Sequence, residues 1–253
     1  KNIIKMNKKL LIFLLLSIPK LLISQNDEKL KISMLNFNFS YHLPGGDLSK
    51  RFGPSSMIGF GFQKKNKNNF LYGLNIEAIA GSNVRENDIL NIITADSLDI
   101  IDINGNTATV RFWQRGLNSS LFIGKVLALS DKNINSGIFI KTSFGFMYHK
   151  IRIEDIGNLA PQLNSELMKG YDKLCMGLSI GEMIGYIYFS KDKRKNFFIG
   201  LESIQGFTND VRRYDYNKKK SYIDDRIDIL TGIKFGWIFL IDRKNNNDKY
   251  YYY

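Results

Sequence analysis

The chain has 253 residues, of which 44% are apolar and 24% are charged, and its formal net charge is +12. This length predicts one main domain, and no apolar run reaches the about 18 residues that a membrane-spanning helix requires. The single cysteine, Cys175, excludes an intrachain disulfide, and two histidines with one cysteine argue against a transition-metal site. We expect neither a metal nor a cofactor.

Residues 1–24 have the composition of a cleavable signal peptide. Lys5, Lys8 and Lys9 form a basic start, Leu10–Ile18 is a short apolar stretch, and a cut is expected after Ser24. Much of the positive charge therefore belongs to the signal. The remaining lysines gather in short turns, where they more commonly meet water or anionic headgroups than nucleic acid. We expect an exported protein with no nucleic-acid partner.

Beyond residue 30 the chain contains eight segments in which apolar and polar residues alternate, as expected for strands with one face in an apolar environment. They are 30–41, 56–65, 69–80, 107–126, 137–150, 173–190, 196–206 and 227–241. The gaps between them alternate between long (42–55, 81–106, 151–172 and 207–226) and short (66–68, 127–136 and 191–195).

This pattern is typical of a transmembrane β-barrel, with tight periplasmic turns and long extracellular loops. The sequence predicts an eight-stranded antiparallel up-and-down barrel over 25–241 with four long outer loops, three short periplasmic turns and a periplasmic tail, 242–253. Such a barrel would lie in the outer membrane of a Gram-negative bacterium and contact its lipid and lipopolysaccharide.

The faces of the strands leave one alternative open. In segment 227–241, one face carries Ile233, Phe235 and Trp237, whereas the other carries Asp228, Lys234 and glycines. A secreted, soluble lipocalin-like barrel that binds an apolar ligand would place the apolar face inside. The regular alternation of loop lengths favours the membrane barrel, in which the apolar face meets lipid.

In two segments the regular alternation of apolar and polar residues along the strand is interrupted. In 173–190, Glu182 falls on the apolar face, and in 107–126 the apolar residues change face part of the way along. A charged group in the middle of a bilayer is unfavourable by a few kcal/mol. For Glu182 we expect either a β-bulge near Gly181 or a position of this segment closer to a headgroup layer, and a β-bulge around 116–119 would reconcile the two halves of 107–126.

Charged residues on the other faces would be enclosed by the barrel. An eight-stranded barrel has just enough interior for its own side chains, so these charges should form a network of ion pairs and hydrogen bonds in a filled lumen rather than line a pore. The residues expected in this network are Glu77, Lys141, Glu202, Asp228 and Lys234.

The outer loops contain the candidate binding residues. Loop 207–226 carries Arg212, Arg213, Tyr214 and Tyr216, which suit contacts with lipopolysaccharide or a protein partner. Catalysis is the less favoured reading. If the barrel were a lipid-modifying enzyme, the set to test would be His42, Asp47 and Ser49 in the first outer loop.

Three segments carry a resemblance to a known group. Residues 170–174 (GYDKL), 184–188 (IGYIY) and 205–208 (QGFT) look similar to small outer-membrane β-barrels of Bacteroidota, of the PorT and PorG kind associated with type IX secretion and gliding. The resemblance implies a non-enzymatic accessory or scaffold role in a secretion or envelope complex. It assigns no catalytic residues. The tail 242–253 departs from the usual barrel ending, an aromatic residue that closes the last strand.

Overall fold

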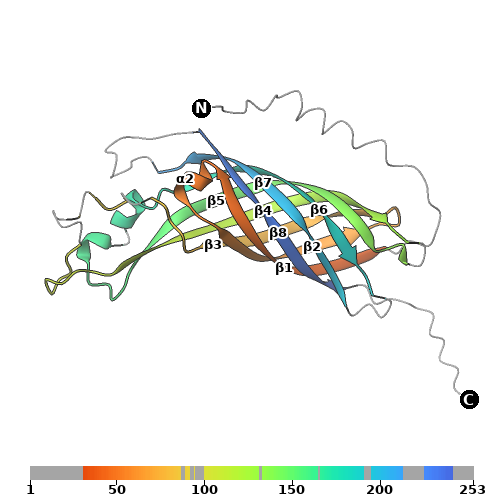
Figure 1. Cartoon of the computed structure of the whole chain (residues 1–253), viewed down its shortest axis with the longest axis horizontal. Coiled ribbons are helices and arrows are strands. Elements are labelled where there is room, and N and C mark those ends of the chain that lie inside the picture. The colour runs from red at the N-terminus through yellow and green to blue at the C-terminus, as the bar shows by residue number, and fades with distance from the viewer. Residues whose placement is uncertain are drawn as a thin grey trace, which may run out of the picture.

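The computed structural model describes residues 31–86, 89–91, 94, 100–130, 133–164, 166–190, 195–212 and 225–241. They form one closed barrel in which each strand pairs antiparallel with its neighbours in sequence and the last strand closes on the first (Figure 1). The strands are β1 (Ile32–Gly46), β2 (Ser55–Lys65), β3 (Phe70–Gly81), β4 (Val110–Ala128), β5 (Gly137–Asp155), β6 (Cys175–Tyr188), β7 (Asn196–Asp210) and β8 (Asp225–Leu240). The predicted eight-stranded up-and-down barrel is confirmed. The predicted signal peptide and tail lie outside the described residues.

Several strands continue further outward than the sequence indicated. β1 reaches Gly46, β5 reaches Asp155 and β7 reaches Asp210, so three of the outer loops are shorter than predicted. The described parts of the outer loops contain three short helices: α2 (Leu48–Arg51), η3 (Pro161–Leu163) and η4 (Leu167–Gly170). Among the described residues, no helix combines the length and apolar character needed to cross a bilayer.

All eight strands carry exposed apolar side chains on the outside of the barrel. On β8, for example, Trp237 is 41% exposed whereas the neighbouring inward side chain of Ile238 is buried. A closed barrel has no unpaired edge, and an apolar exterior suits contact with lipid rather than water. The soluble lipocalin-like alternative is therefore wrong, because it requires the apolar face inside. The chain is a transmembrane β-barrel of the kind found in bacterial outer membranes.

Neither expected β-bulge is present. β4 pairs with β3 and with β5 in one continuous register, and β6 does so with β5 and β7. Glu182 consequently faces outward. Arg111 and Arg115 also face outward and do not join the lumen charges, whereas Val110 and Phe112 point inward and pack beneath the outer loops.

The lumen is filled in three layers. At the periplasmic end lies the inner apolar cluster, formed by Ile32, Met34, Leu71, Phe122, Val126, Phe139, Met183, Ile187, Phe189, Phe198 and Ile238. Buried polar and charged side chains occupy the middle. At the other end the outer apolar cluster joins barrel and loops through Leu48, Phe52, Met57, Ile79, Ile89, Leu90, Ile100, Met147, Ile151, Ile153, Ala160, Leu163, Tyr171, Ile204 and Leu230. The described lumen is thus a packed core, as expected for eight strands.

The sidedness of the barrel can be tested by labelling. Asn104 lies in the long β3–β4 loop and Asn66 in the short β2–β3 turn. On intact cells, a membrane-impermeant maleimide should label Asn104→Cys and leave Asn66→Cys unlabelled, and the native Cys175 is buried and should add little background. Lysis should make Asn66→Cys reactive. The opposite labelling pattern would overturn the topology.

Candidate functional site

A compact charge cluster occupies the middle of the lumen. The Lys234 ammonium on β8 lies 2.5 Å from Glu77 Oε1 on β3 and 2.9 Å and 3.2 Å from the two carboxylate oxygens of Glu202 on β7. All three side chains are buried. His42 Nε2 on β1 lies 3.4 Å from Glu202 Oε2.

Glycines on neighbouring strands make room for these large inward side chains. Glu77 pairs in register with Gly59, Lys234 with Gly200, and Glu202 with Gly232. A Cβ atom on Gly59 would lie only 2.7 Å from Glu77 Cα, so this position has no space for a side chain. The same pairing with an inward glycine occurs at Lys141–Gly124, His149–Gly116 and Asp228–Gly206. Large residues opposite glycines allow a narrow barrel to enclose charged groups.

Lys141 is near this cluster and interacts electrostatically with Glu77, Glu202 and Lys234, but its closest contacts are aromatic. Its ammonium is 4.9 Å from the ring centre of Phe122 and 5.5 Å from that of Phe198, so it sits against the inner apolar cluster. Both distances are within the range of a cation–π contact. Three of the five predicted lumen residues therefore form one ion-paired cluster, and Lys141 contacts aromatic rings instead.

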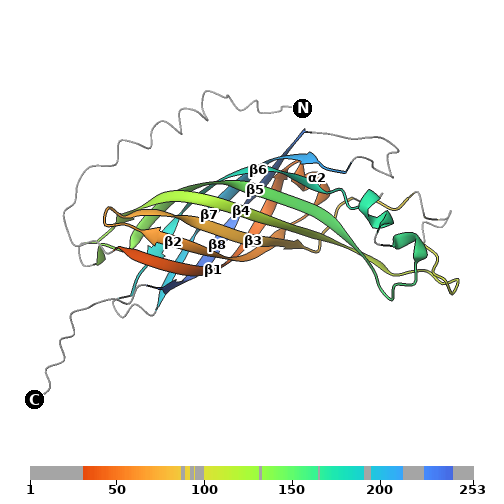
Figure 2. The ribbon, with the colours of Figure 1, turned by 180° about the vertical axis from the view of Figure 1, so that it is seen from behind.

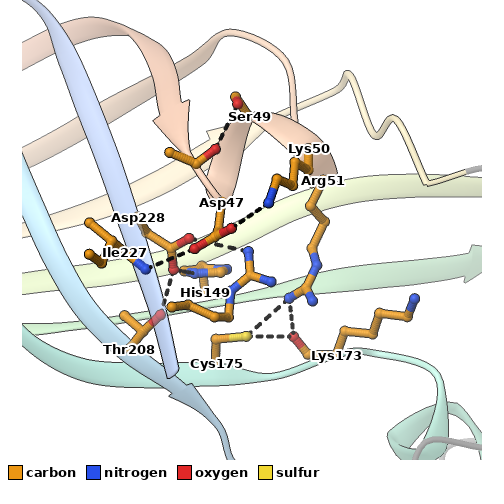
Figure 3. A network of polar contacts seen from close by, with 12 residues as sticks. Asp47, Ser49, Lys50, Arg51, His149, Lys173, Cys175, Thr208, Ile227 and Asp228 are labelled. Atoms are coloured by element: carbon orange, nitrogen blue, oxygen red, sulfur yellow. Dashed lines mark hydrogen bonds and ion pairs between the residues drawn. The ribbon is translucent and has the colours of Figure 1, made fainter. Parts of the chain in front are cut away.

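Asp228, the fifth predicted residue, belongs to a second polar cluster near the outer mouth. Its Oδ2 atom lies 2.8 Å from His149 Nε2 and accepts a 2.5 Å hydrogen bond from the Thr208 hydroxyl, while Arg226 lies 3.2 Å from Oδ1 (Figure 3). His149, Thr208 and Asp228 are fully buried. Both His149 and Thr208 bind the same carboxylate, so this group ties β5, β7 and β8 together.

Helix α2 closes the outer mouth over this second cluster. Its Leu48 and the following Phe52 are fully buried, and the Phe52 ring meets the His149 ring edge-on with centroids 5.7 Å apart. Arg51 enters the mouth, where its Nη1 donates to the Cys175 thiol at 3.0 Å and to the Lys173 carbonyl at 3.1 Å (Figure 3). α2 is therefore a plug fixed by apolar contacts and by one buried guanidinium.

Asp47 holds the start of this plug. Its carboxylate accepts hydrogen bonds from the Lys50 ammonium and from the Ile227 backbone N–H. The bond from Lys50 and then the bond from Ile227 lower the pKa of Asp47. A depressed carboxyl pKa means that this contact stabilises the folded mouth above the ordinary pKa of aspartate and is lost as the pH falls through the lowered value.

The structure does not assemble the candidate catalytic set. β1 continues to Gly46 and carries His42 inward, so its side chain is buried beside Glu202. Asp47 and Ser49 lie on the rim, where the Ser49 hydroxyl donates to the Gly46 carbonyl at 2.8 Å. No histidine is bonded to that hydroxyl. Nor do the described residues contain a group of three or more metal-binding side chains.

The predicted partner-binding loop is described only in part. Arg212 makes two hydrogen bonds to Asp172, at 2.8 Å and 2.5 Å, and thereby ties the β7–β8 loop to the β5–β6 loop. Its role in the described structure is internal. Arg213, Tyr214 and Tyr216 lie outside the described residues.

The lipid-facing surface carries one ionisable side chain within its apolar band. Glu182 is exposed at the middle of β6, between the exposed Ile180 and Ile184. In register beside it lie Thr142 on β5 and Ser203 on β7. Ser203 Oγ is in turn 3.3 Å from Thr231 Oγ1 on β8. Four polar side chains therefore form a row across β5–β8; we call it the lateral polar row.

The chain matches no known family model and no curated protein. Among solved structures it is similar to Ail, the attachment invasion locus protein of Yersinia pestis, with 8% identity, coverage of 83% of this chain and 99% of Ail, and a TM-score of 0.44. It is also similar to Neisserial surface protein A, with 8% identity, coverage of 81% of this chain and 96% of that protein, and a TM-score of 0.43. For the outer membrane protein OprG from Pseudomonas aeruginosa the identity is 11%, the coverage is 85% of this chain and 99% of OprG, and the TM-score is 0.35. On its own closed sheet and apolar exterior, this chain is an eight-stranded outer-membrane β-barrel.

Proposed function

We propose that the barrel is a non-enzymatic accessory or scaffold subunit of a secretion or envelope complex, which it contacts inside the membrane through the lateral polar row. The observation that carries this proposal is the outward-facing Glu182. Ionisable residues within membrane segments are rare, and they usually face a partner rather than lipid. A donor on a neighbouring membrane protein would satisfy this carboxylate and the hydroxyls of Thr142 and Ser203 beside it.

Three further observations support a role based on surfaces. The described lumen is packed with side chains, which favours a role at the surface of the barrel over transport through it. The sequence resemblance to Bacteroidota barrels of the PorT and PorG kind, associated with type IX secretion, agrees with a partner among large envelope machines. His42 is buried within the barrel, which argues against the alternative of a lipid-modifying enzyme that uses this residue.

Photocrosslinking from within the membrane tests the proposal. A photoreactive residue at Ile180, beside Glu182, should give a discrete adduct in native outer membranes with a component of such a complex. The same residue at Phe60, which is exposed on β2 away from the polar row, should not.

Replacing the carboxylate provides the matched control. Glu182→Leu should abolish the Ile180 adduct while the barrel still migrates as a folded, heat-modifiable species, because removing an exposed charge from the apolar band does not disturb the core. Adducts with lipid alone, or an adduct indifferent to Glu182→Leu, would contradict the proposal.

A further inference from the structure

The hairpin of β4 and β5 projects beyond the rest of the barrel. β3 ends at Gly81, opposite Gln114, and β6 begins at Cys175, opposite His149, whereas β4 and β5 continue pairing to Val110 and Asp155. Figures 1 and 2 show both strands running past their neighbours into the region of η3 and η4. We call residues 110–115 and 150–155 the outer extension.

The inward face of the outer extension is held firmly. Ile151 and Ile153 belong to the outer apolar cluster, and Val110 and Phe112 pack against it. The Ile151 N–H also donates to the Asp172 carbonyl at 2.8 Å, which ties β5 to the adjacent loop. Because side chains alternate along a strand, the residues between these inward side chains must point outward.

The outward face of the outer extension is basic. Its register pairs, in order of distance from the membrane, are Arg115–Lys150, Trp113–Arg152 and Arg111–Glu154. Four cations thus face one carboxylate, and that carboxylate accepts a 2.8 Å hydrogen bond from the Trp113 indole. Lys150 lies 3.6 Å from Asp172, but Asp172 already receives two hydrogen bonds from Arg212. The face therefore keeps an excess of positive charge.

The height of these cations matches a headgroup layer. Directly below them the same two strands present Leu117 and Tyr148, then Ser119 and the exposed Phe146, and then the exposed Leu121 and Phe144 of the apolar band. Successive outward rows are roughly 6.6 Å apart along a strand, which is about 5 Å of height at a tilt of about 40°. Arg115 and Lys150 therefore lie just above the level where acyl chains end.

Among the described strands, the outward-facing cations at the outer end lie on this hairpin. At the outer ends of the other strands, the described outward side chains are apolar or uncharged, apart from Asp225 on β8. They include Tyr41, Leu43, Ser56, Ile58, Ala78, Ala80, Met176, Leu178, Phe207, Asn209 and Ile227. At the outer ends of the described strands, therefore, the outward cations cover a single hairpin and do not surround the barrel.

We infer that the outward face of the outer extension binds the phosphate groups of a phosphorylated glycolipid in the outer leaflet. Arginine donates two parallel hydrogen bonds to a phosphate, and lysine contributes a point charge. The Arg115 guanidinium, 5.3 Å from the Trp113 ring, is held beside it by a cation–π contact. This site is independent of the lateral polar row, and it would fix one side of the barrel to the lipid.

Binding can be measured with the purified full-length barrel in detergent micelles. The chain has two tryptophans, so Trp237→Phe leaves Trp113 as a fluorescent reporter within the proposed site. Titration with bisphosphorylated lipid A should change this fluorescence, and lipid A with its phosphates removed should not. The triple variant Arg115→Gln, Lys150→Gln, Arg152→Gln should weaken binding at least about tenfold.

The matched control removes the same number of charges at the periplasmic end, with Lys64→Gln, Lys67→Gln and Lys125→Gln, and should bind as before. Arg152→Gln alone alters a side chain that is 56% exposed, cannot disturb the core, and should weaken binding about threefold. Equal binding of the dephosphorylated lipid would overturn the inference, as would full affinity in the triple variant. So would displacement by an equal concentration of inorganic phosphate, which would show a surface for free anions only.

Discussion

Lys234→Met should lower the free energy of unfolding of the barrel by about 3 to 5 kcal/mol, the range found when one partner of a buried ion pair is removed. Lys234 is fully buried and contacts both Glu77 and Glu202. Without its ammonium, two carboxylates would face each other in the middle of the lumen, with His42 beside Glu202 and with Lys141 as the nearby cation that makes no ion pair with them. Urea titration of the folded barrel in lipid vesicles, followed by tryptophan fluorescence, measures the change.

Two control variants accompany this prediction. Lys67→Met changes an exposed lysine in a turn and should alter stability by less than about 0.5 kcal/mol. Adding Glu77→Gln and Glu202→Gln to Lys234→Met should restore much of the lost stability, because it removes the unpaired charges. A single Lys234→Met variant that unfolds like the parent would show that the cluster does not stabilise the barrel.

Arg51→Met should make Cys175 reactive. The thiol is fully buried beneath α2 and accepts a hydrogen bond from Arg51. Hydrogen bonds from a charged group contribute about 2 kcal/mol, so local opening of the plug should become about 30-fold more frequent. The rate at which an impermeant maleimide labels Cys175 on intact cells should rise by the same factor.

Lys50→Met is the matched control for this prediction. Lys50 lies on the same short helix, but its side chain is 79% exposed and its bond to Asp47 is at the surface. It should leave the labelling rate nearly unchanged. If Arg51→Met also leaves Cys175 unreactive, the seal over the mouth does not depend on the guanidinium.

The strands could be predicted from the sequence because alternation and loop length are local signals. Segment 107–126 shows the limit of that approach. Within the membrane, β4 places Leu121 and Ile123 outward, whereas in the outer extension it places Val110 and Phe112 inward and arginines outward. The strand keeps one register along its whole length. Its outward face is apolar where it meets lipid, and its inward face is apolar beyond the membrane, where it packs against the outer apolar cluster. Alternation reports the environment of a side chain and not its direction, so the sequence suggested a bulge that is absent.

The polar clusters were harder to predict from the sequence, for a different reason. The sequence identifies Glu77, Glu202 and Lys234 as inward residues, but their contacts depend on the relative heights of strands far apart in the chain. His149, Thr208 and Asp228 come together by the same cross-barrel register. Of these three residues, the sequence identified only Asp228 as a lumen charge, because it lies on the strand face that also carries Lys234 and glycines. Arg51 was missed because a four-residue helix in a loop has no periodicity that would indicate which side chain turns inward.

The central charge cluster also sets a condition on the order in which the strands come together. In the open sheet, Glu77 on β3 and Lys234 on β8 lie five strands apart, and they meet only when β8 pairs with β1. A chain that has entered the bilayer without closing would therefore carry unneutralised charges on the face that becomes the lumen. Since such charges are strongly unfavourable in an apolar medium, insertion and closure are coupled. The strand that is synthesised last brings the cation that completes the barrel.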